Sequence, residues 1–328
     1  MVTVPPKRYG MTIPFASVPL VDQREWFEEL ADLGYTDVWS SEANATDAFT
    51  PLALASVWAP SLRLGTAIVP AYTRGPATLA QQVGTMAAAA PGRFVFGIGT
   101  SSDVIVEKWN GLAFEEPYRR TRDTVRFLKD ALTGAKTDTD ATGFSSHGFR
   151  LGVTVPDGQV PIVVAALREG MLKMAGREAD GAVVNWLSAD DTATVSSIVQ
   201  AASPDGTPRE VVARIFVAPT TDRDLVHKFG RLAISAYLNV PVYAAFHEWM
   251  GRGEALAPMW EAWKAGDRAA ALEAIPDEVV DDLIVWGSPE KCREHIDRYV
   301  ANGVTTPVLA ILPFGIDERQ AVRDLAPR

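Results

Sequence analysis

A short run of small and hydroxyl-bearing residues is the first candidate for ligand binding in this sequence. The stretch from Gly92 to Asp103 reads GRFVFGIGTSSD, and its apolar part ends on Gly99, Thr100, Ser101 and Ser102. An apolar run bounded by turn residues predicts a strand buried on both faces. The small residues leave backbone amides free to approach a ligand closely. A tight turn into the next helix explains the same residues equally well.

Two further places carry groups that suit chemistry. In the segment Ala166, Leu167 and Arg168, an apolar run turns into a helical pattern, and the first amides of a helix favour anions such as phosphate. Arg168 would neutralise charge there, or it is simply a solvated residue. Glu42 follows another apolar run and has no obvious partner nearby. It is either a functional carboxylate or a surface one.

Several familiar chemistries have no support in the sequence. The histidines His147, His227, His247 and His295 show no metal-ligand spacing, so we expect no metal site. Cys292 lies within an apolar helical face, where a thiol usually packs rather than reacts. A nucleophile elbow and a Walker A sequence are absent. The remaining backbone groups, hydroxyls, arginines and aromatics suit a cofactor that brings its own chemistry.

The elements that must position these groups alternate regularly along the chain. Apolar runs predict eight strands, each separated from the next by helix, at residues 9–14, 36–40, 62–69, 93–97, 160–165, 181–185, 211–218 and 304–312. This count predicts an α/β protein with a single (β/α)₈ TIM barrel, whose ligand site lies just after the strands. A doubly wound open sheet is the alternative, although G-x-G-x-x-G does not follow the first run.

Two segments interrupt the alternation. Residues 137–152 are rich in Thr, Asp, Gly and Ser and predict a surface excursion or hairpin. Residues 238–282 read as an irregular helical insertion before the last helix and strand, with a crowd of aromatic residues that includes Tyr243, Trp249 and Trp263. These rings either form core packing or wall a substrate pocket. We expect one barrel domain over residues 1–328.

Composition limits the partners of the chain. It has 328 residues, 47% of them hydrophobic, and a formal net charge of −10. This charge disfavours a nucleic acid or membrane partner, and no apolar stretch reaches the length of a membrane span. A single cysteine precludes an internal disulfide and fits a cytoplasmic location. We therefore expect a small-molecule substrate.

The order and spacing of five segments make the chain resemble the luciferase-like superfamily of flavin and deazaflavin barrel enzymes. These segments are GYTDVWSSE (34–42), TPLALAS (50–56), LRLGTAIVP (62–70), PGRFVFGIGTSS (91–102) and AALREGMLKMAGREADGAVVNW (165–186). Within the superfamily the chain is most similar to the actinobacterial oxidoreductases that use coenzyme F420, which are relatives of methylenetetrahydromethanopterin reductase. The resemblance implies a TIM barrel, hydride transfer with F420, and a homodimer.

The resemblance also implies roles for particular residues. In the deazaflavin branch the third strand has a bulge with a non-proline cis peptide that supports the cofactor ring, and the matching bond is Ala67–Ile68. Glu42 matches an acidic residue beside the ring and is the candidate catalytic group. The residues implied to bind the cofactor ring or its phosphate-bearing tail are Ala67, Ile68, Gly99, Thr100, Ser101, Ala166, Leu167 and Arg168.

Two departures bear on the substrate. The sugar-phosphate dehydrogenases of the family have a histidine where this chain has Ala43 and a glutamate where it has Ser102. Their absence disfavours a sugar-phosphate substrate and leaves the proton donor unassigned. The first hypothesis is an F420-dependent oxidoreductase. The alternatives are an FMN-dependent luciferase-like monooxygenase, and an F420- or flavin-binding protein without turnover.

Overall fold

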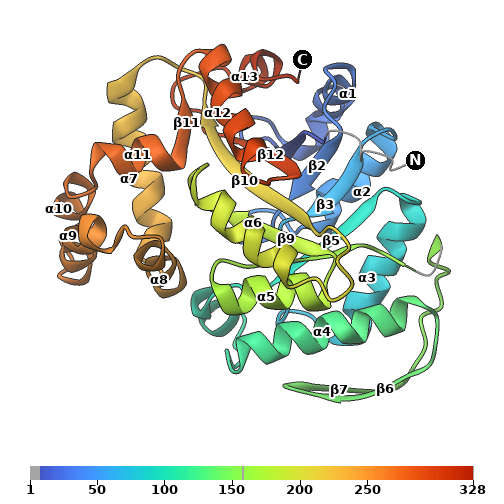
Figure 1. Cartoon of the computed structure of the whole chain (residues 1–328). Coiled ribbons are helices and arrows are strands. Elements are labelled where there is room, and N and C mark those ends of the chain that lie inside the picture. The colour runs from blue at the N-terminus through green and yellow to red at the C-terminus, as the bar shows by residue number, and fades with distance from the viewer. Residues whose placement is uncertain (1–7, 157–158, 328) are drawn as a thin grey trace.

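Eight parallel strands close into a barrel in the computed structural model, which describes residues 8–156 and 159–327 (Figure 1). The strands pair in the order β10–β12–β1–β2–β3–β5–β8–β9, and β9 pairs back onto β10. The barrel strands are β1 (Gly10–Ile13), β2 (Asp37–Ser40), β3 (Arg63–Thr66), β5 (Phe94–Gly99), β8 (Ile162–Ala165), β9 (Gly181–Asn185), β10 (Glu210–Ala218) and β12 (Thr306–Ile311). The predicted TIM barrel is confirmed, and an open doubly wound sheet is ruled out by this closure.

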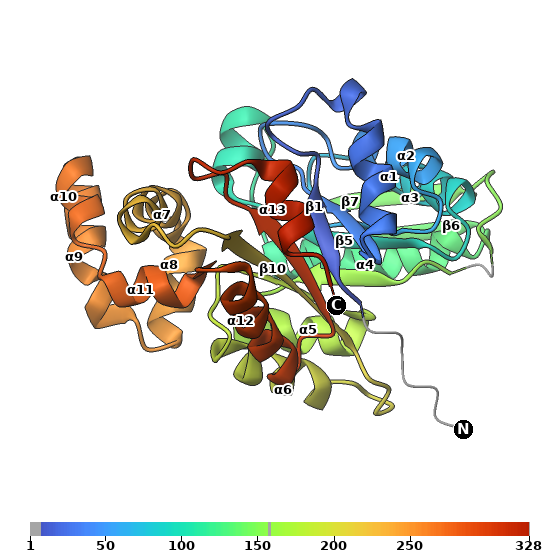
Figure 2. The same ribbon diagram turned by 90° about the horizontal axis from the view of Figure 1, so that it is seen from above.

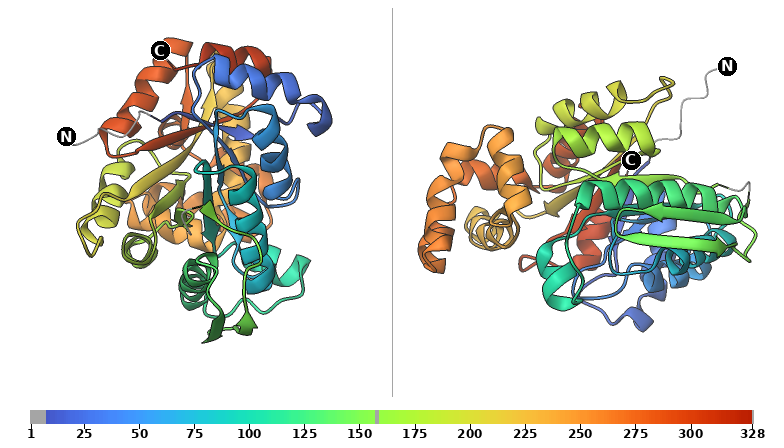
Figure 3. Two further views of the ribbon diagram at one scale, coloured as in Figure 1. Left: turned by 90° about the vertical axis from the view of Figure 1, so that its right-hand side faces the viewer. Right: turned by 90° about the horizontal axis from the view of Figure 1, so that it is seen from below.

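Helices cover the outside of the barrel, because the apolar faces of the strands that point outward must be buried (Figure 3). The covering helices are α1 (Arg24–Asp32), α2 (Phe49–Trp58), α3 (Pro76–Ala89), α4 (Pro117–Leu132), α5 (Glu169–Glu178), α6 (Asp191–Ala201), α12 (Pro289–Ala301) and α13 (Glu318–Asp324). The predicted excursion is an antiparallel hairpin of β6 (Thr137–Ala141) and β7 (Phe144–Phe149) that lies along α4.

The third predicted strand is divided in two. β3 ends at Thr66, and the short strand β4 (Val69–Pro70) resumes the pairing with β5. Between them the Ala67–Ile68 peptide bond is cis, as the resemblance implied, and the only other cis bond in the described residues is Ile13–Pro14. The backbone amide of Ala67 donates to the carbonyl of Ser40 at 2.6 Å, which anchors the interruption to β2.

The helices of the predicted insertion gather on one side of the barrel (Figure 2). They are α8 (Pro241–Trp249), α9 (Gly253–Lys264), α10 (Arg268–Glu273) and α11 (Asp277–Leu283), preceded by the long α7 (Arg223–Leu238). Their apolar residues form a second hydrophobic core that also includes Trp186 and Phe216 from the ends of two barrel strands. The short strand β11 (Ile284–Trp286), which was not predicted, then pairs with β10.

One large ring fills the middle of the barrel. Trp39 in β2 is buried with valines from five other strands, which are Val95, Val163, Val183, Val212 and Val308. The ring crosses the neighbouring strand so closely that a Cβ on Gly65 would lie 2.2 Å from the Trp39 Cε3 atom. Only glycine leaves that space, so Gly65 and Trp39 together set how the interior is packed.

A buried ion cluster closes the amino-terminal end of the barrel beneath this ring. Arg63, the first residue of β3, donates to Glu210 of β10 at 3.0 Å and also bonds Asp37 of β2. Thr306, the first residue of β12, donates to Glu210 at 2.5 Å. Burial works to raise the pKa of the Glu210 carboxyl, but hydrogen bonds and charge attraction from Arg63 outweigh it and lower the pKa. The cluster thus ties four strands together.

Replacing Arg63 with leucine should lower the free energy of unfolding by about 3–5 kcal/mol, since it leaves buried Glu210 without a cation in contact and leaves buried Asp37 with Arg8 alone, at 3.4 Å. Urea unfolding at neutral pH measures this change. Arg24→Leu is the matched control because it breaks the exposed Arg24–Glu28 pair, which we expect to contribute about 1 kcal/mol or less. Similar small losses in both variants would contradict the role given to the cluster.

The cluster also predicts a pH dependence. The pKa of Glu210 is lower in the folded chain than in the unfolded chain, so its stabilisation is present above the unfolded pKa and is lost as pH falls through the folded pKa. Between about pH 5 and about pH 3 the wild type should therefore lose more stability than Arg63→Leu. Parallel losses in the two proteins would show that other carboxylates dominate acid unfolding.

Candidate functional site

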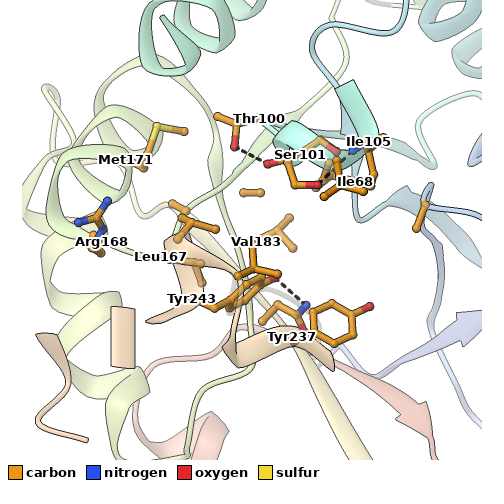
Figure 4. Close-up of a pocket in the computed structure, with 18 of the residues that line it drawn as sticks. Ile68, Thr100, Ser101, Ile105, Leu167, Arg168, Met171, Val183, Tyr237 and Tyr243 are labelled. Atoms are coloured by element: carbon orange, nitrogen blue, oxygen red, sulfur yellow. Dashed lines mark hydrogen bonds between the residues drawn. The ribbon is translucent and has the colours of Figure 1, made fainter. Parts of the chain in front are cut away.

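A cavity of about 1010 Å³ lies at the carboxyl ends of the barrel strands (Figure 4). Loops after β2, β5 and β8 form one side of it, and helices α7–α9 form the other. The predicted site residues that line this cavity are Glu42, Ala67, Ile68, Thr100, Ser101, Ala166, Leu167 and Arg168. The structure thus brings these residues together in one place, while their roles in binding stay predictions.

Gly99 lies against the cavity wall rather than in its lining. A Cβ at this position would meet the Cβ of Ala165 at 2.8 Å and the Cγ1 of Ile68 at 3.0 Å. The glycine therefore lets the end of β5 pack directly between its two neighbouring strands. A larger residue would displace Ile68 or Ala165, both of which line the cavity. The absence of a side chain at Gly99 thus sets the shape of this wall.

The loop after β5 presents backbone groups and small side chains to the cavity rather than large side chains. Ser101 has a φ of 63°, a left-handed conformation that L-residues seldom adopt. The hydroxyl of Thr100 donates to the carbonyl of Ser101 at 3.3 Å, and the backbone amide of Ile105 donates to the hydroxyl of Ser102 at 3.4 Å. Ser102 thus lies just before the π-helix η2 (Val104–Trp109) and bonds its first turn. The loop offers small polar groups suited to an extended anionic ligand.

The amino terminus of α5 adds a positive rim to the cavity. Arg168 is the N-cap residue of this helix, and no side chain caps the first amides. Those amides have no intrahelical acceptor, and the helix dipole adds partial positive charge there. The Arg168 side chain is exposed and makes no hydrogen bond or ion pair with another described residue. In Figure 4 its side chain lies beside Leu167 at the edge of the cavity.

Glu42 has a partner, contrary to the expectation from the sequence. Both carboxylate oxygens accept from the Arg74 guanidinium, at 2.6 and 2.7 Å. The backbone amide of Ala48 also donates to Glu42, at 3.2 Å. Arg74 follows β4 by four residues, so pairing of the third predicted strand with its neighbours brings it to this loop. The sequence could not place it there, because Glu42 and Arg74 are 32 residues apart.

The opposite wall is aromatic and comes from α7–α9. Tyr237, Tyr243, Trp249 and Trp263 line the cavity, and the rings of Tyr237 and Tyr243 are perpendicular with centroids 5.8 Å apart. Of the two interpretations of the insertion's aromatics, a pocket wall therefore holds for Tyr243, Trp249 and Trp263. Loss of hydration raises the pKa of Tyr243 to about 12. Its hydroxyl therefore stays protonated at neutral pH.

The sequence analysis missed one charged residue of the site. Arg214 lies in β10 and lines the cavity. The signal for it was present, because a single charge in the otherwise apolar run VVARIFVA marks a strand position that does not pack as core. Asn185, one of the polar residues at the strand ends, lies directly across from it on β9.

The four histidines do not line the cavity. Within the described residues, no group of three or more His, Cys, Asp or Glu side chains is arranged to hold a metal ion. Across the same residues, none of the helices combines the length and apolar character needed to cross a membrane.

The family profile described as luciferase-like monooxygenase matches residues 5–306 of the chain. The chain is 26% identical to 5,10-methylenetetrahydromethanopterin reductase of Archaeoglobus fulgidus, over 91% of this chain and 92% of that protein. It is also 26% identical to a putative coenzyme F420-dependent oxidoreductase of Mycobacterium tuberculosis, over 90% of each. The structure superposes on the coenzyme F420 dependent tetrahydromethanopterin reductase of Methanopyrus kandleri with a TM-score of 0.78 at 19% identity, covering 97% of each chain.

The Glu42–Arg74 pair predicts coupled effects on stability. Glu42→Gln and Arg74→Met should each destabilise the protein, and the double variant should lose less than the sum, with a coupling energy of about 0.5–3 kcal/mol. Urea unfolding of the four proteins gives this energy. A coupling near zero would show that Glu42 is free to act independently of Arg74.

Proposed function

The chain belongs to the luciferase-like monooxygenase family, and from this premise we propose that it is an oxidoreductase that transfers a hydride between coenzyme F420 and a small organic substrate. Two relatives match about nine tenths of the chain. One is a 5,10-methylenetetrahydromethanopterin reductase, and the other is a putative coenzyme F420-dependent oxidoreductase. The observation that carries the proposal is the combination, in a single cavity, of a small-residue wall with a cationic rim.

The residues of the cavity fit such a cofactor. The apolar wall at Ala67 and Ile68 would receive a fused ring, and Gly99 behind it keeps Ile68 and Ala165 in place because it carries no Cβ. The uncapped amides of α5 and the guanidinium of Arg168 suit the phosphate of the tail. Thr100 and Ser101 would lie along that tail with their hydroxyls and backbone. The charges therefore favour an anionic cofactor even though the whole chain is acidic.

When bound, the deazaflavin supplies or accepts the hydride at its C5 position. The chain's own residues position the reactants and exclude water. The aromatic wall of Tyr237, Tyr243, Trp249 and Trp263 covers the cavity on the side away from the small-residue wall. Holding two reactants at about 3–3.5 Å in a dry cavity removes much of the entropic barrier to transfer. The catalytic role first suggested for Glu42 is less direct, because Arg74 engages both of its oxygens.

A side-by-side titration with F420 and FMN tests the cofactor. We expect F420 to bind at least about tenfold more tightly, a difference of ~1.4 kcal/mol. Fluorescence of the deazaflavin and of the flavin reports both affinities. Tighter binding of FMN would indicate a flavin-dependent monooxygenase instead. Binding of either cofactor, with no substrate found to oxidise its reduced form, would indicate a binding protein.

Variants of Ser101 locate the tail. Ser101→Phe should weaken F420 binding by about tenfold or more, since a bulky side chain would fill the space where the loop approaches the ligand. Ser101→Gly is the matched control, because glycine favours the left-handed conformation and should retain binding. Ser145→Phe, on the exposed hairpin strand β7, controls for an added aromatic ring. Unchanged affinity in Ser101→Phe would place the tail elsewhere.

A further inference from the structure

Arg214 places a positive charge inside the barrel, near the carboxyl ends of its strands. Val212, two residues earlier on β10, belongs to the cluster that fills the interior. Side chains alternate along a strand, so Arg214 points inward one layer higher, where it lines the cavity. Its Nε atom is buried and has no hydrogen-bond partner, and its guanidinium lies 5.0 Å from the centre of the Phe216 ring.

Arg214 differs from the other buried or half-buried arginines in the described parts of the chain. Each of the other eleven arginines that are buried or half-buried in residues 8–156 and 159–327 donates a hydrogen bond to a carboxylate or a backbone carbonyl. Arg214 donates none within those residues. Burying the Nε–H group of Arg214 without an acceptor is unfavourable, and an anion bound in the cavity that Arg214 lines would supply the missing partner.

The neighbours of Arg214 supply a second donor. Asn185 lies opposite it across the β9–β10 pairing, and its amide nitrogen donates to the Tyr243 hydroxyl oxygen at 3.3 Å. That bond occupies a lone pair of the hydroxyl and leaves its hydrogen free to donate to a ligand. Arg214 and Tyr243 both line the cavity, and Asn185 lies between them, opposite Arg214 in the sheet and bonded to the Tyr243 hydroxyl. A guanidinium and a phenol together favour an oxyanion.

The positions of the other charges around the cavity indicate that Arg214 binds an anionic group of the substrate rather than the cofactor tail. Glu42 is paired with Arg74, and Glu169 is paired with Lys173 at 2.6 Å. The groups proposed for the tail lie after β5 and β8. In the ring of eight strands, β10 lies directly opposite β3, after which the Ala67–Ile68 wall follows. Arg214 thus faces the proposed ring-binding wall from across the cavity.

We propose that Arg214 and Tyr243 bind a carboxylate of the substrate, so that this protein acts on small organic acids. The acid would lie with its anionic end on β10 and its apolar body against the aromatic wall of α7–α9. The assignment of this acid as the substrate rests on the proposed function, whereas the carboxylate site itself does not.

Binding of uncharged and charged isosteres tests the proposal. The probes are acetate, hexanoate, benzoate and cinnamate, each beside its primary amide, titrated into the protein by calorimetry with and without saturating F420. We expect at least one acid to bind about tenfold or more tightly than its amide. Arg214→Met, which keeps the length of the side chain without its charge, should abolish that preference, and Arg214→Lys should retain part of it. Tyr243→Phe should weaken the acid more than the amide.

Further measurements separate the alternatives. F420 affinity should change by less than about threefold in Arg214→Met, since the tail lies elsewhere. A larger loss of F420 affinity would assign Arg214 to the cofactor and overturn the proposal, as would equal binding of every acid and its amide by the wild type. A fall in Tm of more than about 4 °C in Arg214→Met would overturn it too, by showing a structural role. Preference for acids without any F420 binding would instead contradict the proposed cofactor and leave the carboxylate site standing.

Discussion

A closed barrel of eight strands encloses an interior that side chains must fill, and this chain fills it unevenly. The ring of Trp39 occupies the middle because Gly65 makes room for it beside β3. Below the ring, Arg63 lies 5.5 Å from its centre and joins Asp37 and Glu210 in a buried ion cluster. Above it, small residues such as Ala67 and Ala165 leave the interior open as the cavity. The barrel interior is therefore closed at its amino-terminal end and open at its carboxyl end because of the sizes of these few side chains.

Arginine has a different role at each end of the barrel. At the amino-terminal end Arg63 is fully engaged by carboxylates that come from β2 and β10, so its charge serves the cohesion of the strands. At the carboxyl end Arg214 and Arg168 line the cavity and neither forms an ion pair within the described residues, while Glu42 and Glu169 are paired with other cations. An acidic protein with a net charge of −10 thereby carries a cavity whose free charges are positive. Local pairing, rather than net charge, decides which ligands this cavity favours.

The alternation of apolar runs and helical patterns was enough to predict the eight strands and their closure, because both faces of each barrel strand must be apolar. The family resemblance carried the finer points, including the cis bond at Ala67–Ile68 and the residues around the cavity. What could not be predicted depends on contacts between distant parts of the chain. Arg74 reaches Glu42 only after the strand between them has paired, and the orientation of Arg214 follows from the register of β10. The wall of aromatic rings needed the placement of α7–α9, which no local pattern specifies.

The second hydrophobic core has a consequence for how this protein can diverge. Its members, among them Leu256, Met259 and Val280, pack with one another and with barrel residues that include Trp186 and Phe216. Residues far apart and without shared partners have largely independent effects on stability. Replacement of Tyr237, Trp249 or Trp263 therefore reshapes one side of the cavity while Trp39 and the ion cluster continue to hold the strands. The helical wall can thus change its ligand preference while the barrel fold is kept, because ligand choice and barrel stability depend on separate sets of residues.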